Sequence, residues 1–597
     1  MISENPEFSV NKKNHKFKSF FANQSIVLIL AVTTFAKLLA FNTSVLRVTW
    51  PFDQYLDGVV MSFATCLLLF SPLLLINKYK NHLAIILASL ASTLILIDAV
   101  YFLYFSSLPS VGLLAQIGQT GDVSSSIAGL IKWWMALLFV DIALLIIFRK
   151  FFASIKHRFE KPSRILSLGA VATAIVVFIV SGIWVGTTKL NDVFNEGYDT
   201  VSTAQYYGVF LAHTIDITRF IHETTVSLSE QEKQAVNDWV RQHEMTSQTN
   251  EYTGLAKGKN IIMLQVESLG SFVINQQING KAITPNLDQL SKTTEFFPND
   301  RFKIGAGHTS DTDFVVNSSY FPLNDAAVFV RYGHDDFTGL PKLFTKNGYS
   351  ANVYHGFNRN FWNRDIAVRS LGYQNFYAAD NYPKGEIINM GLNDGDFLAR
   401  TADYIKDQAK PSLSHVITLT SHVPFSITDT TRGLDINPSL YPNGTAGYLE
   451  DINYTDRMIG KFFDKLKTNG LYEDSLIVIF GDHTPVLPSF SAGTINYDNS
   501  SNQAKEVPLF IKLPNSTVGN THASQGTHLD IMPTILDLAG IKTNQLMFGT
   551  SLFATDRSVC EDQLSISTSR DCRAAVSEAE NYSAKIIRYN LFKDLPN

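Results

Sequence analysis

Five long, nearly uncharged apolar segments occupy the first third of the chain, and they constrain its fold more than any other feature. They lie near Ile26–Phe41, Val59–Ile76, Leu83–Phe105, Ile127–Phe148 and Leu166–Val185. A helix of about 20 apolar residues crosses the hydrocarbon core of a bilayer. One such segment could be a buried helix of a soluble protein, but five separated by short loops predict a membrane domain of five helices over residues 26–185.

Basic residues predict how these segments are oriented. The first-to-second loop carries only Arg47, and the loop from Ser106 to Ser126 carries no lysine or arginine. Lysine and arginine crowd the N-terminal tail, the loop after the second segment and the loop after the fourth. By the positive-inside rule, residues 1–25 are then a cytoplasmic tail, and everything after the fifth segment lies outside. These basic residues are Lys12, Lys13, Lys16, Lys18, Lys78, Lys80, Arg149, Lys150, Lys156, Arg158, Lys161 and Arg164.

The pattern changes twice after the apolar region. Residues 186–254 are mixed and predict a connector, with an aromatic helix around Ala204–Phe220 that could lie along the membrane surface or pack on the outer domain. Residues 255–597 alternate short β-branched runs with amphipathic segments, which predicts an α/β domain whose mostly parallel sheet carries helices on both faces. The predicted strands are 260–268, 349–356, 414–422, 475–483 and 507–514, and the predicted helices are 285–292, 339–348, 361–372, 395–407, 455–470 and 529–540.

Charge and cysteine usage exclude little but agree with this organisation. The net charge of -5 comes with no long basic stripe, so nothing indicates a nucleic-acid partner. Cys66 lies within an apolar segment, which leaves Cys560 and Cys572 as a possible pair in an oxidising exterior.

Side chains that commonly ligate metals or bind phosphate follow three of the predicted strands. One strand ends at Glu267, another at His422, and a third at Asp482 and His483. The Asp-His pair alone could be an ordinary strand-to-loop turn. In an open parallel sheet, however, ligands bind outside the carboxyl ends of the strands, so these residues are expected to converge on one crevice.

A glycine-containing loop, GAGHTSDTDF, adds a candidate nucleophile. The segment from Asp311 onward reads as a helix, so Thr309 would lie near a helix N-terminus. Backbone N–H groups there favour an anion, whether a phosphate or the alkoxide of Thr309 itself. The alternative is that Thr309 or Ser310 only caps the helix.

These motifs, behind five apolar segments, resemble those of the lipoteichoic acid synthase family. That family consists of membrane-anchored phosphoglycerol transferases with a sulfatase-like outer domain of the alkaline-phosphatase superfamily. The resemblance covers nearly the whole chain, in the family's order. The motifs that carry it are Glu267 in QVESLGSF, Thr309 in GAGHTSDTDF, FWNR at Phe361–Arg364, SHVPF at Ser421–Phe425 and GDH at Gly481–His483.

The resemblance implies a metal centre with a nucleophile in it. Glu267, Thr309, Asp482 and His483 would hold one divalent ion, and Thr309 would also be the nucleophile. Three oxygen ligands and one imidazole suit Mn²⁺ or Mg²⁺, although Zn²⁺ also accepts these ligand types. A divalent ion stabilises the alkoxide that a free threonine hydroxyl does not form at neutral pH.

The resemblance also implies substrate contacts. His422, Trp362 and Arg364 would contact the substrate phosphate, and His355 in YHG is a further candidate for that pocket. Arg364 offers a planar fork, and His422 could bond the phosphate or protonate the leaving alcohol. The plainer alternatives are a packed helix start for Trp362 and Arg364, a satisfied core imidazole for His355 and a turn residue for His422. His528 is expected to have only a structural or supporting role.

We therefore predict an enzyme of a bacterial cell membrane that moves phosphoglycerol from an anionic phospholipid, such as phosphatidylglycerol, through a covalent Thr309 intermediate. The acceptor would be an envelope glycan or a polyglycerolphosphate chain. Phosphoethanolamine transfer and sulfatase-type or phosphodiesterase-type hydrolysis are the alternatives, and a catalytically silent scaffold is a third. The chain lacks the C/S-x-P-x-R motif of sulfatases. It also has His308 where the family usually has lysine, which weakens predictions about headgroup and acceptor.

Overall fold

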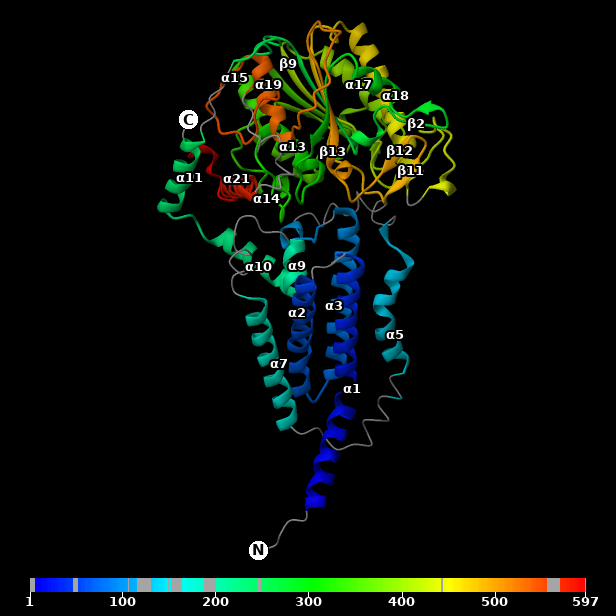
Figure 1. The fold of residues 1–597 in the computed structure, drawn as a ribbon, viewed down its shortest axis with the longest axis vertical. Helices are drawn as coiled ribbons and strands as arrows, with labels where there is room; N and C mark the ends of the chain where they lie inside the picture. The colour runs from blue at the N-terminus through cyan, green and yellow to red at the C-terminus, as the bar shows by residue number, and fades with distance from the viewer. Residues whose placement is uncertain are drawn as a thin grey trace. The chain divides into compact units, whose positions relative to one another are not determined.

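The computed structural model describes residues 6–46, 52–105, 107–114, 130–148, 151, 164–186, 200–243, 249–441, 444–555 and 570–595. The chain forms two compact units, one comprising residues 1–111 and 130–224, and the other comprising residues 112–129 and 225–597 (Figure 1). Each unit is described by itself below.

Among its described residues, the first unit contains four helices long and apolar enough to cross a membrane. They match four of the five predicted segments, with ends that differ by up to eight residues. The second candidate span combines an α-helix with the short 3₁₀ helix η1, Ser71–Leu75, because Pro72 has no N–H to continue the α-helical pattern. The helices are α1 Pro6–Ser44, α2 Phe52–Phe70, α3 Lys80–Phe105 and α7 Arg164–Val185, and the candidate spans are Lys18–Ser44, Leu56–Leu75, Lys80–Leu103 and Arg164–Val185.

The segment predicted at Ile127–Phe148 differs from the expectation. Its described part is the 3₁₀ helix η3, Trp133–Phe139, followed by α5, Val140–Ile147. Residues 127–129 lie outside the described residues. At the usual rise per residue these two helices together span about 26 Å, somewhat less than the ~30 Å hydrocarbon core. A membrane domain of five full-length helices is therefore not confirmed.

A polar cluster holds this shorter helix against its neighbours in the first unit. The Lys37 ammonium donates to both oxygens of Asp141, at 2.7 and 2.8 Å, and to Ser92 Oγ at 2.9 Å. Thr33 Oγ1 donates to the same carboxylate at 2.6 Å. These residues come from α1, α3 and α5, so a charge within an apolar helix is matched by groups on two other helices.

Three helices lie among the described residues between α7 and residue 254. In the first unit, α9 is Thr200–Tyr207 and α10 is Val209–Thr225. The Asp216 carboxylate of α10 accepts hydrogen bonds from Ser110 Oγ and from the Val111 N–H. In the second unit, α11 is Glu230–Gln242, whose N-terminus is closed by a capping box between Ser229 and Glu232.

The second unit is built on a seven-stranded sheet in the order β4-β13-β10-β1-β9-β5-β6. Strands β10, β1, β9, β5 and β6 run parallel, whereas β13 is antiparallel to both of its neighbours. The predicted mostly parallel sheet is confirmed. The strands are β1 Ile261–Val266, β4 Glu295–Arg301, β5 Ser350–His355, β6 Asn375–Tyr377, β9 Ser412–Ile417, β10 Leu476–Gly481 and β13 Glu506–Lys512.

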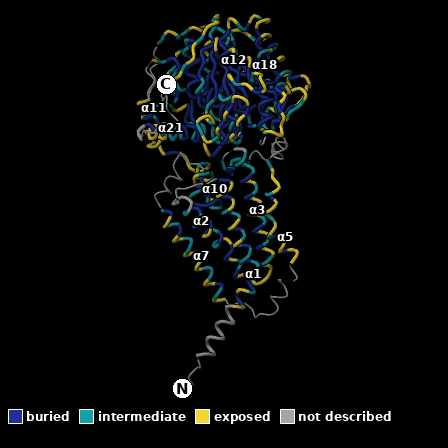
Figure 2. The backbone as a smooth tube through the Cα atoms, turned by 45° about the vertical axis from the view of Figure 1, so that its right-hand side comes forward, coloured by how far each residue is buried: buried dark blue, intermediate teal, exposed yellow. Residues whose placement is uncertain are grey.

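Helices cover both faces of this sheet. Along β1, Ile261 and Met263 belong to one hydrophobic core, and Ile262 and Leu264 belong to the other. The strand is therefore buried on both sides, and Figure 2 shows the interior of this unit as buried throughout. The helices are α12 Pro285–Leu290, α13 Thr309–Ser318, α14 Val328–Tyr332, α15 Leu340–Lys346, α16 Arg364–Leu371, α17 Asp394–Lys406, α18 Thr445–Thr468, α19 Ile531–Ala539 and α21 Arg570–Arg588.

Several features of this unit were not predicted. Strand β4 contains Pro298, which lacks a donor for a sheet ladder, and the strand indeed lies at the sheet edge. Helix α21 was not predicted either. Cys572 of α21 is disulfide-bonded, and Cys66 is a free, buried thiol; Cys560 lies outside the described residues. Short two-stranded sheets are formed by β2 Gln277–Ile278 with β3 Lys281–Ala282, β7 Ile387–Ile388 with β8 Gly391–Leu392, and β11 Phe490–Ala492 with β12 Ile495–Tyr497.

Candidate active site

Two neighbouring strand ends bring the predicted acidic and imidazole ligands together. Strands β1 and β10 pair in parallel with Val266 opposite Gly481. Glu267 follows the first strand and Asp482 follows the second, so parallel pairing makes them neighbours. His483 is the next residue, and one ligand atom from each of the three lies within 4.8 Å of those of the others.

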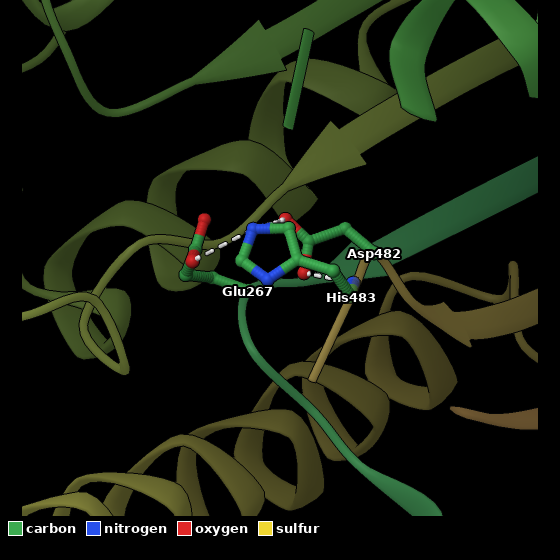
Figure 3. Close-up of side chains that lie close together, drawn as sticks. All are labelled: Glu267, Asp482 and His483. Atoms are coloured by element: carbon green, nitrogen blue, oxygen red, sulfur yellow. Dashed lines mark hydrogen bonds and ion pairs between the residues drawn. The ribbon is translucent and has the colours of Figure 1, made fainter. Parts of the chain in front are cut away.

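The three side chains face one another at close range. His483 Nε2 lies 3.7 Å from Glu267 Oε1 and 3.5 Å from Asp482 Oδ2. Figure 3 shows the imidazole between the two carboxylates. Glu267 and Asp482 are buried, so two acidic groups share a site with little access to water.

Thr309 joins this cluster from a different element. It is the first residue of α13, and its Oγ1 lies 3.3 Å from Glu267 Oε2 and 3.4 Å from His483 Nε2. The residue before it, His308, has a φ of 45°, a conformation that is uncommon for a non-glycine residue and is enriched at functional sites. The four residues expected to share an ion are thus close together.

The loop before Thr309 is fixed by the helix that follows it. Asp311 Oδ2 accepts the N–H groups of Gly305 and Gly307 at 2.9 and 2.8 Å. A Cβ on Gly305 would overlap the carbonyl oxygen of Leu323. The glycine is therefore needed because another backbone segment approaches it closely.

The donor set fits a divalent cation. Asp482 Oδ1 accepts the N–H groups of Ser268 and His483, both at 2.7 Å. Asp482 Oδ2 is buried, and no described residue donates a hydrogen bond to it. An unsatisfied buried carboxylate oxygen is costly unless a ligand neutralises it.

The hydrogen bonds of His483 prepare it for the same role. Its Nδ1 lies 3.1 Å from the carbonyl oxygen of Thr484, which can only accept, so the proton is on Nδ1. Nε2 then presents its lone pair to the cluster, as metal-bound imidazoles do.

The electrostatics of the cluster reflect an excess of negative charge. Burial, and then the charge of Glu267, raise the pKa of Asp482. Burial lowers the pKa of His483, but the charges of Asp482 and Glu267 outweigh it, so the pKa is raised. Both shifts follow from two carboxylates buried close together, an excess of negative charge that a bound cation would balance.

His422 lies farther from its strand than predicted. Strand β9 ends at Ile417 rather than at His422, and residues 418–422 form a loop with a turn at Thr420 and Ser421. The prediction placed the strand end too late because Thr418 and Leu419 continue the β-like pattern. Nδ1 of His422 donates to the Val423 carbonyl oxygen at 2.7 Å. Burial lowers the pKa of His422 to about 4, so the ring is neutral at neutral pH.

The remaining predicted substrate contacts lie in the same unit. His355 is the last residue of β5, is buried, and donates from Nδ1 to the Ile417 carbonyl oxygen. Burial, and then the charge of Arg364, lower its pKa well below the usual value. Trp362 is buried with a φ of 57° and lies two residues before the start of α16. Arg364 opens α16 and pairs with Asp313 at 2.8 Å.

Sequence reasoning missed two supporting residues. Asp313 could have been found from its position four residues after Thr309, which puts both on one face of α13. Ser268, whose Oγ donates to Glu267 Oε1 at 2.7 Å, gave no such signal. His528 donates from Nε2 to the Gly481 carbonyl oxygen at 2.9 Å, which agrees with the predicted supporting role.

Comparison with known proteins connects both units to one family. Residues 8–228 match the lipoteichoic acid synthase N-terminal domain, and residues 259–541 match the sulfatase family. A lipoteichoic acid synthase of Staphylococcus aureus strain USA300 is 31% identical over 493 residues, which cover 78% of this chain and 74% of that protein.

Solved structures agree. The lipoteichoic acid synthase LtaP from Listeria monocytogenes is 26% identical with a TM-score of 0.51, over 61% of this chain and 99% of that one. The integral membrane protein lipooligosaccharide phosphoethanolamine transferase A from Neisseria meningitidis shares the fold, with a TM-score of 0.51 at 13% identity over 88% of this chain and 95% of that one. The chain therefore belongs to the lipoteichoic acid synthase family and is an enzyme of that type within the sulfatase-like superfamily.

Proposed function

We propose that this protein transfers phosphoglycerol from an anionic membrane phospholipid, phosphatidylglycerol, to an acceptor hydroxyl through a covalent intermediate on Thr309. One observation carries the proposal: Thr309 is the first residue of a helix, and its hydroxyl oxygen lies 3.3 Å from Glu267 Oε2 and 3.4 Å from His483 Nε2. A helix N-terminus favours the negative charge that an attacking alkoxide and a phosphate both bring. The acceptor would be an envelope glycan or a polyglycerolphosphate chain.

A divalent ion, Mn²⁺ or Mg²⁺, fits the site, and Zn²⁺ would accept the same ligand types. Glu267, Thr309, Asp482 and His483 would hold it, because they offer three oxygens and the unprotonated Nε2 of an imidazole. When bound, such an ion lowers the pKa of a coordinated hydroxyl and neutralises phosphoryl oxygens.

In the first half of the reaction, Thr309 Oγ attacks the lipid phosphorus. The bond from phosphorus to the diacylglycerol oxygen breaks, and the proton that Thr309 Oγ loses ends on this oxygen, so diacylglycerol leaves as the free alcohol. Arg364 and Trp362 would contact the phosphate. The guanidinium supplies donors with a geometry that matches phosphate oxygens.

In the second half, an acceptor hydroxyl attacks the phosphorus on Thr309, and the bond to Thr309 Oγ breaks. Neutral His422 has its proton on Nδ1, so its Nε2 can accept a hydrogen bond from the attacking hydroxyl, whose proton passes to Thr309 Oγ as that bond breaks. His355 has the same tautomer, so its Nε2 can accept a hydrogen bond from a substrate hydroxyl but cannot donate one to a phosphate oxygen.

The membrane unit would keep the catalytic domain near its lipid substrate. We propose five crossings, with the short helical segment Trp133–Ile147 as the fourth, residues 1–25 in the cytoplasm and residues 255–597 outside. The distribution of basic residues supports this orientation, and the polar cluster around Asp141 supports the insertion of the short segment beside α1 and α3.

The test uses the full chain in detergent with Mg²⁺ or Mn²⁺ and lipids that carry a labelled headgroup. We expect diacylglycerol release from phosphatidylglycerol and a phosphoglycerol adduct on the peptide that contains Thr309. Thr309→Ala should abolish both without unfolding the protein, and Thr309→Ser should retain part of the activity. Unchanged release by Thr309→Ala would disprove the nucleophile assignment. Preference for phosphatidylethanolamine would favour phosphoethanolamine transfer, and headgroup release only to water would favour a hydrolase.

A further inference from the structure

Arg364 is held in the protein in an unusual way for a residue expected to bind phosphate. Its side chain is 1% exposed, and Nε donates to Asp313 Oδ2 at 2.8 Å. Nη1 is buried, and no described residue accepts a hydrogen bond from it. Leaving a buried guanidinium donor unpaired is costly, so this atom is available to a ligand while Nε anchors the group.

The anchor is part of the helix that carries the proposed nucleophile. Thr309 and Asp313 are four residues apart on α13, so their side chains lie one turn apart on the same face. Arg364 comes from α16, a different helix. The contact between Asp313 and Arg364 therefore fixes the guanidinium relative to Thr309 through less than two turns of rigid helix.

The other oxygen of Asp313 ends a chain of buried hydrogen bonds. Gln265 Nε2 donates to Asp313 Oδ1 at 2.9 Å, and His415 Nε2 lies 3.1 Å from Gln265 Oε1. Asn317 Nδ2 lies 3.3 Å from His415 Nδ1, and the Tyr373 hydroxyl donates to Asn317 Oδ1 at 2.8 Å. All five side chains are buried.

The hydrogen bonds of this chain all run in one direction, from the Tyr373 hydroxyl to the Asp313 carboxylate. A carboxylate can only accept, so Gln265 must turn its amide nitrogen toward Asp313 and its oxygen toward His415. His415 then donates from Nε2 and accepts at Nδ1. Burial lowers the pKa of His415 to about 4, which keeps the ring neutral, as this arrangement requires.

We propose that Asp313 is a positioning residue for Arg364, and that the chain from Tyr373 through Asn317, His415 and Gln265 fixes the orientation of its carboxylate. The role rests on the proposed phosphoryl transfer, because the oriented atom is the one that would bind the phosphate. Asp313 itself touches no reacting group. It sets the direction in which Arg364 presents Nη1.

The test separates positioning from stability by means of the full chain in detergent with Mg²⁺. Asp313→Asn has one oxygen for two donors, so Arg364 or Gln265 loses its partner. We expect kcat/KM for phosphatidylglycerol to fall about 10-fold to 100-fold, as misplacement of a binding group does. The affinity for inorganic phosphate, measured by thermal shift, should fall about 10-fold. In an Arg364→Gln background, Asp313→Asn should change either value by less than about threefold.

Two further variants complete the test. Tyr373→Phe removes only the first donor of the chain, so its loss should be smaller, in the same direction, and absent in the Arg364→Gln background. Arg369→Gln, on the exposed side of α16, is the matched control and should match the wild type.

Each outcome is decisive. Full additivity of Asp313→Asn with Arg364→Gln, or unchanged phosphate affinity in Asp313→Asn, would overturn the positioning role. If Asp313→Asn does not fold, Tyr373→Phe decides: lower phosphate affinity at an unchanged melting temperature supports the proposal, and unchanged affinity refutes it. If the wild type does not turn over phosphatidylglycerol, the proposed function fails, and the phosphate-affinity measurements alone decide the positioning role.

Discussion

Replacing Asp482 by asparagine should leave the protein as stable as the wild type without metal, yet nearly inactive. Asp482 Oδ1 accepts two backbone N–H groups, from Ser268 and His483, and an asparagine oxygen can accept both. The other oxygen, Oδ2, is the buried atom that receives no hydrogen bond from the described residues. The substitution thus keeps the turn, removes one of two neighbouring buried carboxylates, and removes a proposed metal ligand.

The alanine variant provides the contrast. Asp482→Ala would leave two buried N–H groups without acceptors, at about 1–3 kcal/mol each. Unfolding entropy is about 2.1 cal/mol/K per residue, or roughly 0.8 kcal/mol/K for residues 225–597. The melting temperature of the metal-free alanine variant should therefore fall by about 3–8 °C, whereas that of the asparagine variant should not fall.

Adding metal should separate the melting temperature of Asp482→Asn from that of the wild type. A divalent ion at 100 times its Kd adds about 2.7 kcal/mol to stability, which corresponds to a rise of about 3 °C in the melting temperature of the wild type. Asp482→Asn should lose most of this rise, together with about 100-fold or more of the diacylglycerol release.

Thermal melting is monitored by tryptophan fluorescence, once with EDTA and once with Mg²⁺. Diacylglycerol release from phosphatidylglycerol is measured on the same variants. Asp365→Asn, a partly exposed carboxylate on α16, is the control and should behave as the wild type. If Asp482→Asn keeps both the full metal-dependent rise and the turnover, then Asp482 is not a metal ligand and the reasoning fails.

Three further predictions concern other parts of the molecule. Gly305→Ala places a Cβ against the Leu323 carbonyl oxygen, so denaturant unfolding should show a stability about 1–3 kcal/mol lower. Because Thr309 would move, diacylglycerol release should also be at least about 10-fold slower. Asp141→Ala leaves the Lys37 ammonium buried without its carboxylate and should destabilise the full chain by about 3–5 kcal/mol. The double variant Asp141→Leu with Lys37→Met should restore the melting temperature in detergent, and failure to do so would contradict the pairing. Burial raises the pKa of Asp451 to about 9, so the native state holds a proton that the unfolded chain releases above about pH 4, and this group lowers stability progressively as pH rises from about 4 toward 9. Asp451→Asn should therefore raise the melting temperature relative to the wild type at pH 8 and change it little at pH 4. An equal change at both pH values would count against the assignment.

The sequence predicted the parallel sheet and the central cluster because both follow from local patterns. Buried parallel strands read as continuous β-branched runs, and polar residues directly after them mark the ligand edge of the sheet. Glu267 and Asp482 each come immediately after such a run, so their meeting follows from the pairing of β1 with β10. The edge strand β4 was missed because Pro298 interrupts its pattern.

Other features depend on contacts that no local pattern reveals. The described part of the fourth predicted membrane segment is a 3₁₀ helix followed by a short α-helix, and its charged residue Asp141 pairs with Lys37, more than one hundred positions earlier. The pairing of Asp313 with Arg364 spans 51 positions and two helices. Such pairs are visible only after folding, because no local pattern tells which distant residue each partner will meet.

Strand β1 connects the two halves of the proposed chemistry. Gln265 and Glu267 are two residues apart at the end of this strand. Gln265 donates to Asp313, the anchor of Arg364, and Glu267 belongs to the proposed metal site. Helix α13 repeats the arrangement, since Thr309 lies at the cluster and Asp313 holds Arg364. Two rigid elements therefore each carry one group for the metal and one for the phosphate clamp. A shift of either element would misplace both groups together, which explains how a site assembled from four distant segments can keep the geometry that in-line attack on phosphorus requires.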